Sequence, residues 1–448
     1  MIDPENKPKV PESLLAQIWK GQWVQKGPLP TTEGLMVRVR SPGIENKDSG
    51  PDFLGATIVL DDELLKGDVE LHVKSSDWRA HGHHLDPHFN EVILQVVLWD
   101  DAKKSAQLQS GNLIPTLSLH DYLNGSMDEL SLRATNFPLP LLPCRGAGRR
   151  LSEGRLGEIL DQSGEERFYI KSAFFEVGLI LEEPDQVFYQ GIMGALGYTK
   201  NKRAFQELAR RLPLRVLESI AQEQELESRM VMLQALLLGA AGLLPSQCEG
   251  KSGLGKLPTS SELEGIWRSL SIKSTMSYAD WHFFRMHPRN FPTQRLIAAG
   301  HLFDRYLDRG LLNGVLDLVS EAKPGKGATT IEEGLVIPDF LGQGRAREIA
   351  VNVILPFSFA WTEADSQPKL KEHSLVLYRT YPRLGENQIT RYLSELFWGR
   401  GKARVVNSAQ RQQGLIHLYK TFCQEQRCEA CPVNALLEEV IRPTSGSA

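Results

Sequence analysis

The chain has 448 residues, of which 41% are hydrophobic and 24% are charged. These are ordinary globular values, so they exclude disordered, collagen-like and disulfide-scaffold proteins. Lys and Arg total 51 against 55 Asp and Glu, a formal net charge of −4. Because this bulk charge attracts neither a nucleic acid nor an anionic membrane, any nucleic-acid binding has to use a local basic face.

The first third of the chain predicts one helix followed by a sheet. Pro11-Glu12-Ser13 is a helix-start signal, and the β-rich runs LMVRVR, ATIVL, DVELHV and EVILQVVLW come after it. Turn formers such as SPG and KDSGPD separate these runs. This order predicts an α/β or α+β sheet domain over residues 1–145.

Beyond Arg150 the apolar residues recur three and four apart, which predicts a large, mainly α-helical domain over residues 146–320. The remaining part, residues 321–448, is predicted to contain a β-like segment, REIAVNVILPFSFAW, and C-terminal helices that end in a cysteine cluster. The stretch from Met230 to Leu244 is shorter than the roughly 20 apolar residues a membrane span needs, so a buried helix is expected there.

The N-terminus has charges and prolines where an export signal needs an apolar core. We therefore expect a cytoplasmic protein with no membrane partner.

One predicted strand carries an unusual row of ionisable side chains. Because side chains alternate across a strand, Asp68, Glu70, His72 and Lys74 share one face, and three aliphatic residues share the other. Asp52 precedes an earlier strand. A purely structural alternative is a half-exposed hairpin whose charges pair across strands.

This arrangement resembles the PD-(D/E)xK nuclease superfamily, which implies a restriction-endonuclease-like sheet domain with the order α-β-β-β-α-β. On this resemblance, Asp52 and Glu70 would bind Mg²⁺ or Mn²⁺, since hard cations prefer carboxylate oxygens, and the ion would activate water. The sequence departs from the pattern at His72, where the superfamily has Lys. His72 or Lys74 would then orient the water or contact the phosphate.

A histidine-rich loop follows this strand, from Trp78 to His88. In it, His81, His83 or His84 could bind a metal ion together with Asp86, because imidazole is the commonest ligand of zinc and related metals. Alternatively, these side chains satisfy the turns of the loop and one another.

Three cysteines near the C-terminus form the strongest metal signal. Cys423, Cys428 and Cys431, followed by Pro432, have a spacing that suits zinc or an iron–sulfur cluster. The string resembles the cluster loop of helix-hairpin-helix DNA glycosylases, but that family's fourth cysteine position is Leu437 here. His417, Cys144 or Cys248 could supply the fourth ligand, or it could be absent. The alternative is three reduced structural cysteines.

Basic and aromatic residues alternate in two stretches of the helical part. Lys200, Lys202 and Arg203 lie in the first, and Arg285, Arg289, Asn290 and Arg295 lie in the second. Such side chains could contact a phosphate backbone or clamp a phosphate or carboxylate. They are also typical of a helix surface whose aromatic residues face the core.

Long motifs resemble an uncharacterised bacterial family of unknown function across essentially the whole chain; they include GPDFLGA, GDVELHVKSSDW, HGHHLDPHFNEVILQVV and WHFFRMHPRNFPTQRL. That resemblance implies no activity. The residues favour a divalent-metal-dependent nuclease or phosphodiesterase acting on nucleic acid. A non-catalytic metal- or partner-binding protein and a His-loop metallohydrolase with another substrate remain the alternatives.

Overall fold

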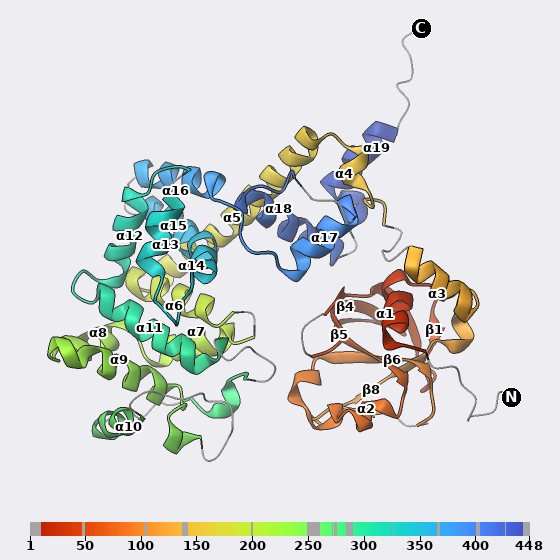
Figure 1. Ribbon diagram of the computed structural model, residues 1–448, viewed down its shortest axis with the longest axis horizontal. Helices are drawn as coiled ribbons and strands as arrows, with labels where there is room; N and C mark the ends of the chain where they lie inside the picture. Colours follow the sequence, from red (N-terminus) through yellow and green to blue (C-terminus); the bar gives the residue numbers. More distant parts are fainter. Residues whose placement is uncertain are drawn as a thin grey trace, which may run out of the picture. The chain divides into compact units, whose positions relative to one another are not determined.

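The computed structural model describes residues 10–46, 50–102, 105–136, 142–198, 200–248, 260–270, 272, 276–283, 290–325, 327–364, 368–399, 404–425 and 427–441. The chain forms two compact units. The first comprises Met1–Ile159, Glu386–Val405 and Leu415–Ala448, and the second comprises Leu160–Gly385 and Val406–Gly414. Figure 1 shows strands in the first unit and helices throughout the second.

The first unit contains a mixed sheet, as the N-terminal sequence predicts. Its strands are β1 (Leu29–Pro30), β2 (Met36–Ser41), β3 (Ile44–Glu45), β4 (Phe53–Leu60), β5 (Glu63–Lys74), β6 (Val92–Trp99) and β9 (Thr116–Ser118). The order is β1-β2-β4-β5-β6-β9, and β3 pairs with β4. Strands β2, β4 and β5 are antiparallel, whereas β5, β6 and β9 run parallel. A separate pair joins β7 (Ala106–Gln107) to β8 (Leu113–Ile114).

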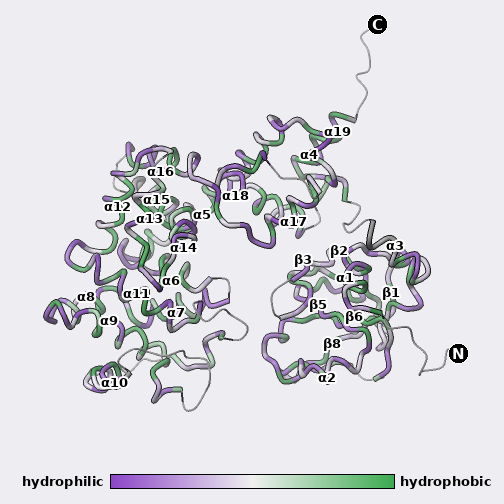
Figure 2. Tube along the Cα trace, in the orientation of Figure 1, coloured by the Kyte–Doolittle hydropathy of each residue, from purple (hydrophilic) through white to green (hydrophobic). Residues whose placement is uncertain are grey.

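One face of this sheet is a hydrophobic core. Val69 and Leu71 of β5 pack with Leu94 and Val96 of β6 against α1 (Glu12–Gly21) and α3 (Met127–Asn136). In Figure 2 these strands and α1 carry hydrophobic, green segments. The strand alternation that predicts an aliphatic face on β5 is therefore confirmed.

The opposite face of the sheet is polar but also covered. Between β5 and β6 the chain forms α2 (Asp77–Ala80) and the short 3₁₀ turns η1 (His83–Leu85) and η2 (Pro87–Phe89). Trp78 and Phe89 from this crossover are buried. As a result, Glu70 and His72 are only 6% and 1% exposed. The predicted half-exposed hairpin is therefore wrong, because the crossover seals this face.

The C-terminal part of the first unit packs with the sheet. It contains α17 (Gln388–Trp398), the π-helical turn η8 (Tyr419–Cys423), the 3₁₀ turn η9 (Cys428–Ala430) and α19 (Pro432–Ile441). The short helix α4 (Ala147–Arg150), from earlier in the chain, contacts both α17 and α19. Lys66 of β5 forms an ion pair with Glu425 at 2.7 Å. The predicted three-part division separates these C-terminal helices from the sheet, whereas one compact unit contains both.

The second unit is helical, as the periodicity predicts. Its helices are α6 (Pro184–Leu196), α7 (Lys202–Arg211), α8 (Leu214–Gln222), α9 (Leu226–Ala240), α10 (Ser260–Ser269), α11 (Pro292–Tyr306), α12 (Leu311–Glu321), α13 (Gly327–Leu335) and α16 (Pro368–Thr380), together with most of α5 (Glu153–Leu181). Three 3₁₀ turns connect longer elements: η3 (His120–Tyr122) in the first unit, and η4 (Pro245–Gln247) and η5 (Tyr278–Asp280) in the second. The helix α18 (Ala409–Leu418) begins in the second unit and ends in the first.

Two apolar stretches of the second unit bear on the sequence predictions. By length and composition, Leu226–Gln247 passes as a membrane span among the described residues, but 72% of its most apolar window is buried inside the protein. The run predicted as β-like is helical instead: it forms α14 (Gln343–Ile349), a π-helical turn (Ala350–Ile354) and α15 (Leu355–Ala364). A helix that is buried all round has no polar face, so its sequence reads like a buried strand.

Gly43 allows the chain to turn from β2 into β3, so that both strands pair with β4. Its φ is +84°, and an added Cβ would lie 2.7 Å from the main-chain oxygen of Leu54. We expect Gly43→Ala to lower the free energy of unfolding by about 1–3 kcal/mol, because the left-handed backbone and the clash with β4 both oppose a side chain. Urea unfolding measures this change.

Gly154 in α5 is the matched control, since its φ is not positive and, apart from its chain neighbours and the backbone of its own helix, no atom lies within 4 Å of its added Cβ. Gly154→Ala should leave stability unchanged or raise it slightly. Equal losses in the two variants would contradict this account of Gly43.

Candidate functional site

A β-bulge places Asp52 beside Glu70. Asp52 stands directly before β4, and near its start β4 has one residue more than the facing part of β5. Gly55 lies in this bulge with φ +64°, a conformation that glycine adopts without steric cost. The main-chain N–H of Gly55 donates to Asp68 Oδ1 at 2.9 Å. Asp68 therefore stabilises the bulge. The sequence prediction places it with Glu70, His72 and Lys74 because all four share one face of the strand.

Asp52 and Glu70 each bind the main chain of the other's strand. The amide of Asp52 donates to Glu70 Oε2 at 3.0 Å, and the amide of Leu71 donates to Asp52 Oδ2 at 3.0 Å. Burial, and secondly the charge of Glu70, raise the pKa of Asp52 to about 7. The charge of Glu12, at the start of α1, raises it further. The main-chain hydrogen bond from Leu71 and the charge of His83 act in the opposite direction and lower it.

His72 belongs to a buried hydrogen-bond network on the same face. Gln95 lies opposite Glu70 on β6, and its Nε2 donates to His72 Nδ1 and to the main-chain oxygen of Ser75, both at 3.3 Å. Thr116 donates to Gln95 Oε1 at 3.1 Å. Because Nδ1 accepts, the proton of the neutral ring is on Nε2, which lies 3.7 Å from Glu70 Oε1. Burial, and then His83 and His81, lower the pKa of His72 to about 3.

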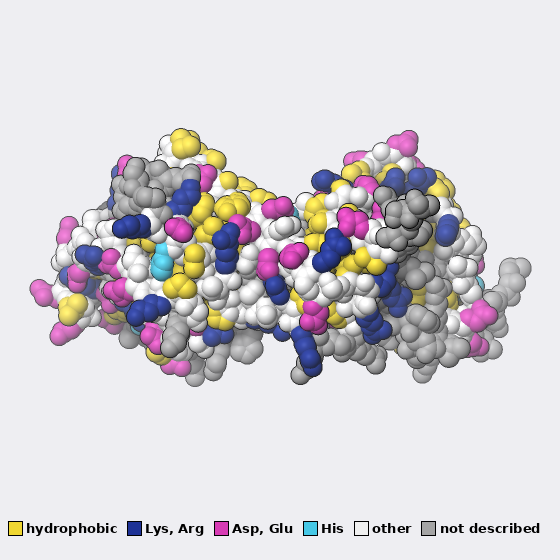
Figure 3. Space-filling model, turned by 90° about the horizontal axis from the view of Figure 1, so that it is seen from above, with side chains coloured by type: hydrophobic (Ala, Val, Ile, Leu, Met, Phe, Trp, Pro, Cys, Tyr) yellow, Lys and Arg dark blue, Asp and Glu magenta, His cyan; other side chains and the backbone are white. Residues whose placement is uncertain are grey.

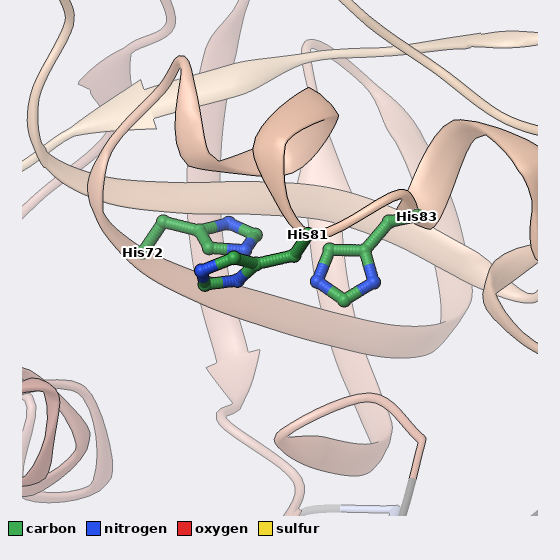
Figure 4. Close-up of side chains that lie close together, drawn as sticks. All are labelled: His72, His81 and His83. Atoms are coloured by element: carbon green, nitrogen blue, oxygen red, sulfur yellow. The ribbon is translucent and has the colours of Figure 1, made fainter.

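Three histidines, His72, His81 and His83, lie close together, as Figure 4 shows. The loop turns at Gly82, with φ +76°, so that His81 and His83 both approach His72. Each of the three offers a ring nitrogen within 4.8 Å of the others. His83 Nε2 also lies 3.1 Å from Glu70 Oε1. This group could hold a metal ion, and it joins the histidine loop to the carboxylates.

The structure leaves three other predicted site residues outside this group. Lys74 is exposed at the end of β5, where its main-chain amide donates to Asp77 Oδ2. His84 is half-buried and does not belong to the group formed by His72, His81 and His83. Asp86 accepts from the main-chain amide of His88 at 2.9 Å and pairs with the His88 ring. The Asp86 side chain therefore caps η2, as the alternative to metal binding predicted for the polar residues of this loop.

Two residues that act on this site, Gln95 and Glu12, were not predicted from the sequence. Gln95 is the one polar residue in the run VILQVVLW, and it is 1% exposed. A lone amide in a buried strand needs hydrogen-bond partners, so it could have been noticed as part of a polar network. Nothing in the sequence indicates that the first turn of α1 lies near Asp52.

In the helical unit, Arg295 is buried and engaged by the protein itself. It is 5% exposed and donates to the main-chain oxygen of Phe340, to Tyr198 Oη and to Asn290 Oδ1. The guanidinium of Arg345 also stacks over the Tyr198 ring, 3.0 Å from its centroid. Arg295 and Asn290 therefore hold helices together, which makes them unsuited to the surface clamp predicted for them.

The other predicted basic contacts differ in their accessibility. Lys200, Lys202 and Arg203 are exposed at the start of α7, while Arg285 and Arg289 lie outside the described residues. On the face drawn in Figure 3, basic side chains are interspersed with acidic ones. This pattern agrees with the nearly balanced charge of the chain.

The three C-terminal cysteines all lie in the first unit. Cys423 ends η8, Cys428 begins η9, and Cys431 directly precedes α19. Burial raises the pKa of each thiol. Cys248, one of the candidates for a fourth ligand, lies in the core of the second unit, where its thiol donates to the main-chain oxygen of Gly242.

The raised pKa of Asp52 predicts a pH-dependent cost of folding. The folded pKa of about 7 exceeds the ordinary value of 3.8, so the folded state holds an extra proton between these pH values and wild-type stability falls as pH rises through them. Asp52→Asn removes this cost and keeps an acceptor for Leu71. The free energy of unfolding of the variant relative to wild type should therefore increase from pH 4 to pH 8 in chelator-treated protein.

The exposed Asp62 provides the control, and Asp62→Asn should show no such increase. A flat difference for Asp52→Asn would mean that its carboxyl is solvated.

The comparisons with known proteins identify the family. No curated protein and no solved structure matches the chain. The family described as "Protein of unknown function (DUF2851)" matches residues 12–323, which include the sheet, the bulge, the histidine loop and much of the helical unit. The resemblance carried by GPDFLGA and GDVELHVKSSDW is therefore confirmed, and the chain belongs to the DUF2851 family.

Proposed function

We propose that the sheet-bearing unit is a Mg²⁺- or Mn²⁺-dependent phosphodiesterase that acts on nucleic acid. The observation that carries the proposal is the pair of carboxylates: Asp52 and Glu70 are held side by side by main-chain hydrogen bonds, and the pKa of Asp52 is raised to about 7. A divalent cation is the natural partner of two such groups, because it favours their ionised forms.

The order of elements supports the same class. Helix α1 is followed by the antiparallel strands β2, β4 and β5, then by the crossover with α2, and finally by β6, which is parallel to β5. This order agrees with the α-β-β-β-α-β core that the PD-(D/E)xK resemblance implies. Asp52 directly precedes β4 and Glu70 lies within β5, and these are the two residues to which that resemblance assigns the metal ion.

The side chains suggest a division of labour. A bound cation would supply charge stabilisation to the phosphodiester and lower the pKa of a water molecule. Asp52 and Glu70 would hold that ion. His72 is only 1% exposed, so it would orient the water through Nε2–H, in place of the superfamily's lysine. Gln95 would set the tautomer of His72 through Nδ1.

The three-histidine group favours a second candidate, a metallohydrolase with another substrate. Its difficulty is His72, since ligation through Nε2 would require moving the proton to Nδ1 and giving up the bond from Gln95. Zinc content separates the candidates. If the wild-type protein holds one zinc ion per chain, and both His81→Ala and His83→Ala lose it, the metallohydrolase is favoured. Weak Mg²⁺ or Mn²⁺ binding that depends on Asp52 and Glu70 favours the nuclease.

Glu70→Gln tests the proposed function directly. Purified wild-type protein should cleave end-labelled DNA or RNA with Mn²⁺, and EDTA should stop the reaction. In Glu70→Gln the rate should fall about 100-fold or more, because one metal carboxylate is lost. Gel analysis of the cleavage products measures the rate.

Glu63→Gln removes an exposed carboxylate from the same strand and should keep the wild-type rate. A wild-type protein that is inert on single- and double-stranded DNA and RNA would overturn the nuclease proposal. It would favour the non-catalytic alternative, in which Glu70→Gln changes stability or partner binding alone.

His72 and Lys74 are predicted to differ in importance. His72→Ala should slow cleavage by about 100-fold or more, the usual range for a lost proton donor or acceptor. Lys74→Ala should change the rate by less than about tenfold, since Lys74 is exposed at the end of β5. Circular dichroism would confirm that both variants fold. The opposite order of effects would show that Lys74 takes the superfamily's lysine role.

A further inference from the structure

Four of the five cysteines in the chain gather at one place in the first unit. All five are free thiols. Cys144 lies far upstream of Cys423, Cys428 and Cys431 in the sequence, yet it belongs to the same compact unit. The tertiary structure therefore adds a fourth thiol to the C-terminal three, as a complete metal site would need.

Packing of short elements brings these cysteines together. Cys144 lies in the turn that leads into α4, where its main-chain oxygen accepts from the amide of Ala147 at 3.0 Å. Cys431 directly precedes α19, and α19 packs against α4. The amide of Cys431 donates to the oxygen of Cys428 at 3.2 Å, and η9 in turn packs against η8, which ends at Cys423.

The thiols are close enough to influence one another electrostatically. Burial, followed by Cys431 and Cys428, raises the pKa of Cys144 to about 12. Burial, followed by Cys144, Cys431 and Cys428, also raises the pKa of Cys423. Cys144 and Cys431 are buried and Cys423 and Cys428 are half-buried, and the pKa of each thiol is raised, which suits neither a catalytic thiolate nor a disulfide exchange site. A metal centre compensates the charge of four thiolates, because ligation removes their protons.

The spacing of the sulfur atoms bears on the kind of centre. A single zinc ion holds its sulfur ligands at about 2.3 Å, so neighbouring sulfurs would lie about 4 Å apart. Among the described residues, no three of the cysteine sulfurs lie within 4.8 Å of one another. In a four-iron cluster each thiolate binds a different iron atom, and the sulfurs lie farther apart.

We infer that Cys144, Cys423, Cys428 and Cys431 bind a [4Fe–4S] cluster, with Cys144 as the fourth ligand that the sequence leaves open. The ligation balances when each thiol releases one proton and binds one iron of the cluster. His417 is the other candidate for the fourth ligand. Its Nε2 lies 3.5 Å from Thr421 Oγ1. The half-buried ring of Tyr392 and the buried ring of Tyr419 lie beside the cysteines and would limit access of solvent to the cluster.

The test uses the full chain reconstituted under anaerobic conditions with sulfide and ferric iron, half of which dithiothreitol reduces to the ferrous state that the oxidised cluster requires. We expect about four iron atoms and four sulfides per chain. A broad visible absorption band should appear and should bleach on reduction, together with an electron paramagnetic resonance signal of the reduced cluster. Cys144→Ser should retain less than about a tenth of the wild-type iron. Cys248→Ser, which alters the cysteine in the helical core, should retain all of it.

Alkylation of cluster-loaded wild-type protein, read by mass spectrometry, tests the ligand set even where Cys144→Ser fails to fold. Cys144 should be protected together with the three C-terminal cysteines, and all four should become reactive when a chelator removes the iron. Binding of one zinc ion in place of iron, absence of any metal, or a Cys144 that reacts while iron is bound would each overturn the inference. None of these measurements depends on nuclease activity.

Discussion

The candidate site depends on two carboxylates from neighbouring strands, each fixed by the main chain of the other: Asp52 is half-buried directly before β4, and Glu70 is buried within β5. Burying an ionised carboxylate is costly unless a cation or hydrogen bonds compensate it. Asp52 and Glu70 have the hydrogen bonds, but the raised pKa of Asp52 shows that these do not fully compensate the charge. The proposed cation would compensate this charge, and in its absence a proton does so.

The surroundings of this pair determine which chemistry is available. The crossover after β5 covers the polar face, and Trp78 and Phe89 exclude water from one side of it. Within this enclosure Gln95 controls the tautomer of His72, so the ring presents a proton toward Glu70. A neutral donor beside a metal carboxylate suits phosphate chemistry better than it suits a third imidazole ligand. This favours the nuclease proposal over the His-loop metallohydrolase.

The C-terminal segment connects the cysteines to the carboxylate site within one unit. Gln424 follows Cys423 directly, and its side chain lies 3.3 Å from the position of a Cβ added to Gly55 in the β4 bulge. Glu425 pairs with Lys66 of β5. The inferred cluster would hold this segment against the hairpin that positions Asp52. A structural cluster can thus influence the site without taking part in the reaction.

The sequence by itself determined the elements that depend on local periodicity. Alternation over Asp68 to Lys74 predicted both faces of β5, and spacing of three and four predicted the helical unit, because these patterns are set by the geometry of single elements. The same reasoning failed for the run from Arg347 to Trp361, since a helix buried on all sides has no polar face to mark its period.

Only the tertiary structure decided which residues meet. The bulge at Gly55 assigns Asp68 to the backbone and leaves Asp52 beside Glu70. Helix and loop packing bring Glu12 near Asp52 and Cys144 near the C-terminal cysteines. Turn capping removes Asp86 from the histidine group. Such contacts join residues far apart in the chain, and they follow from how elements pack rather than from any pattern within one of them.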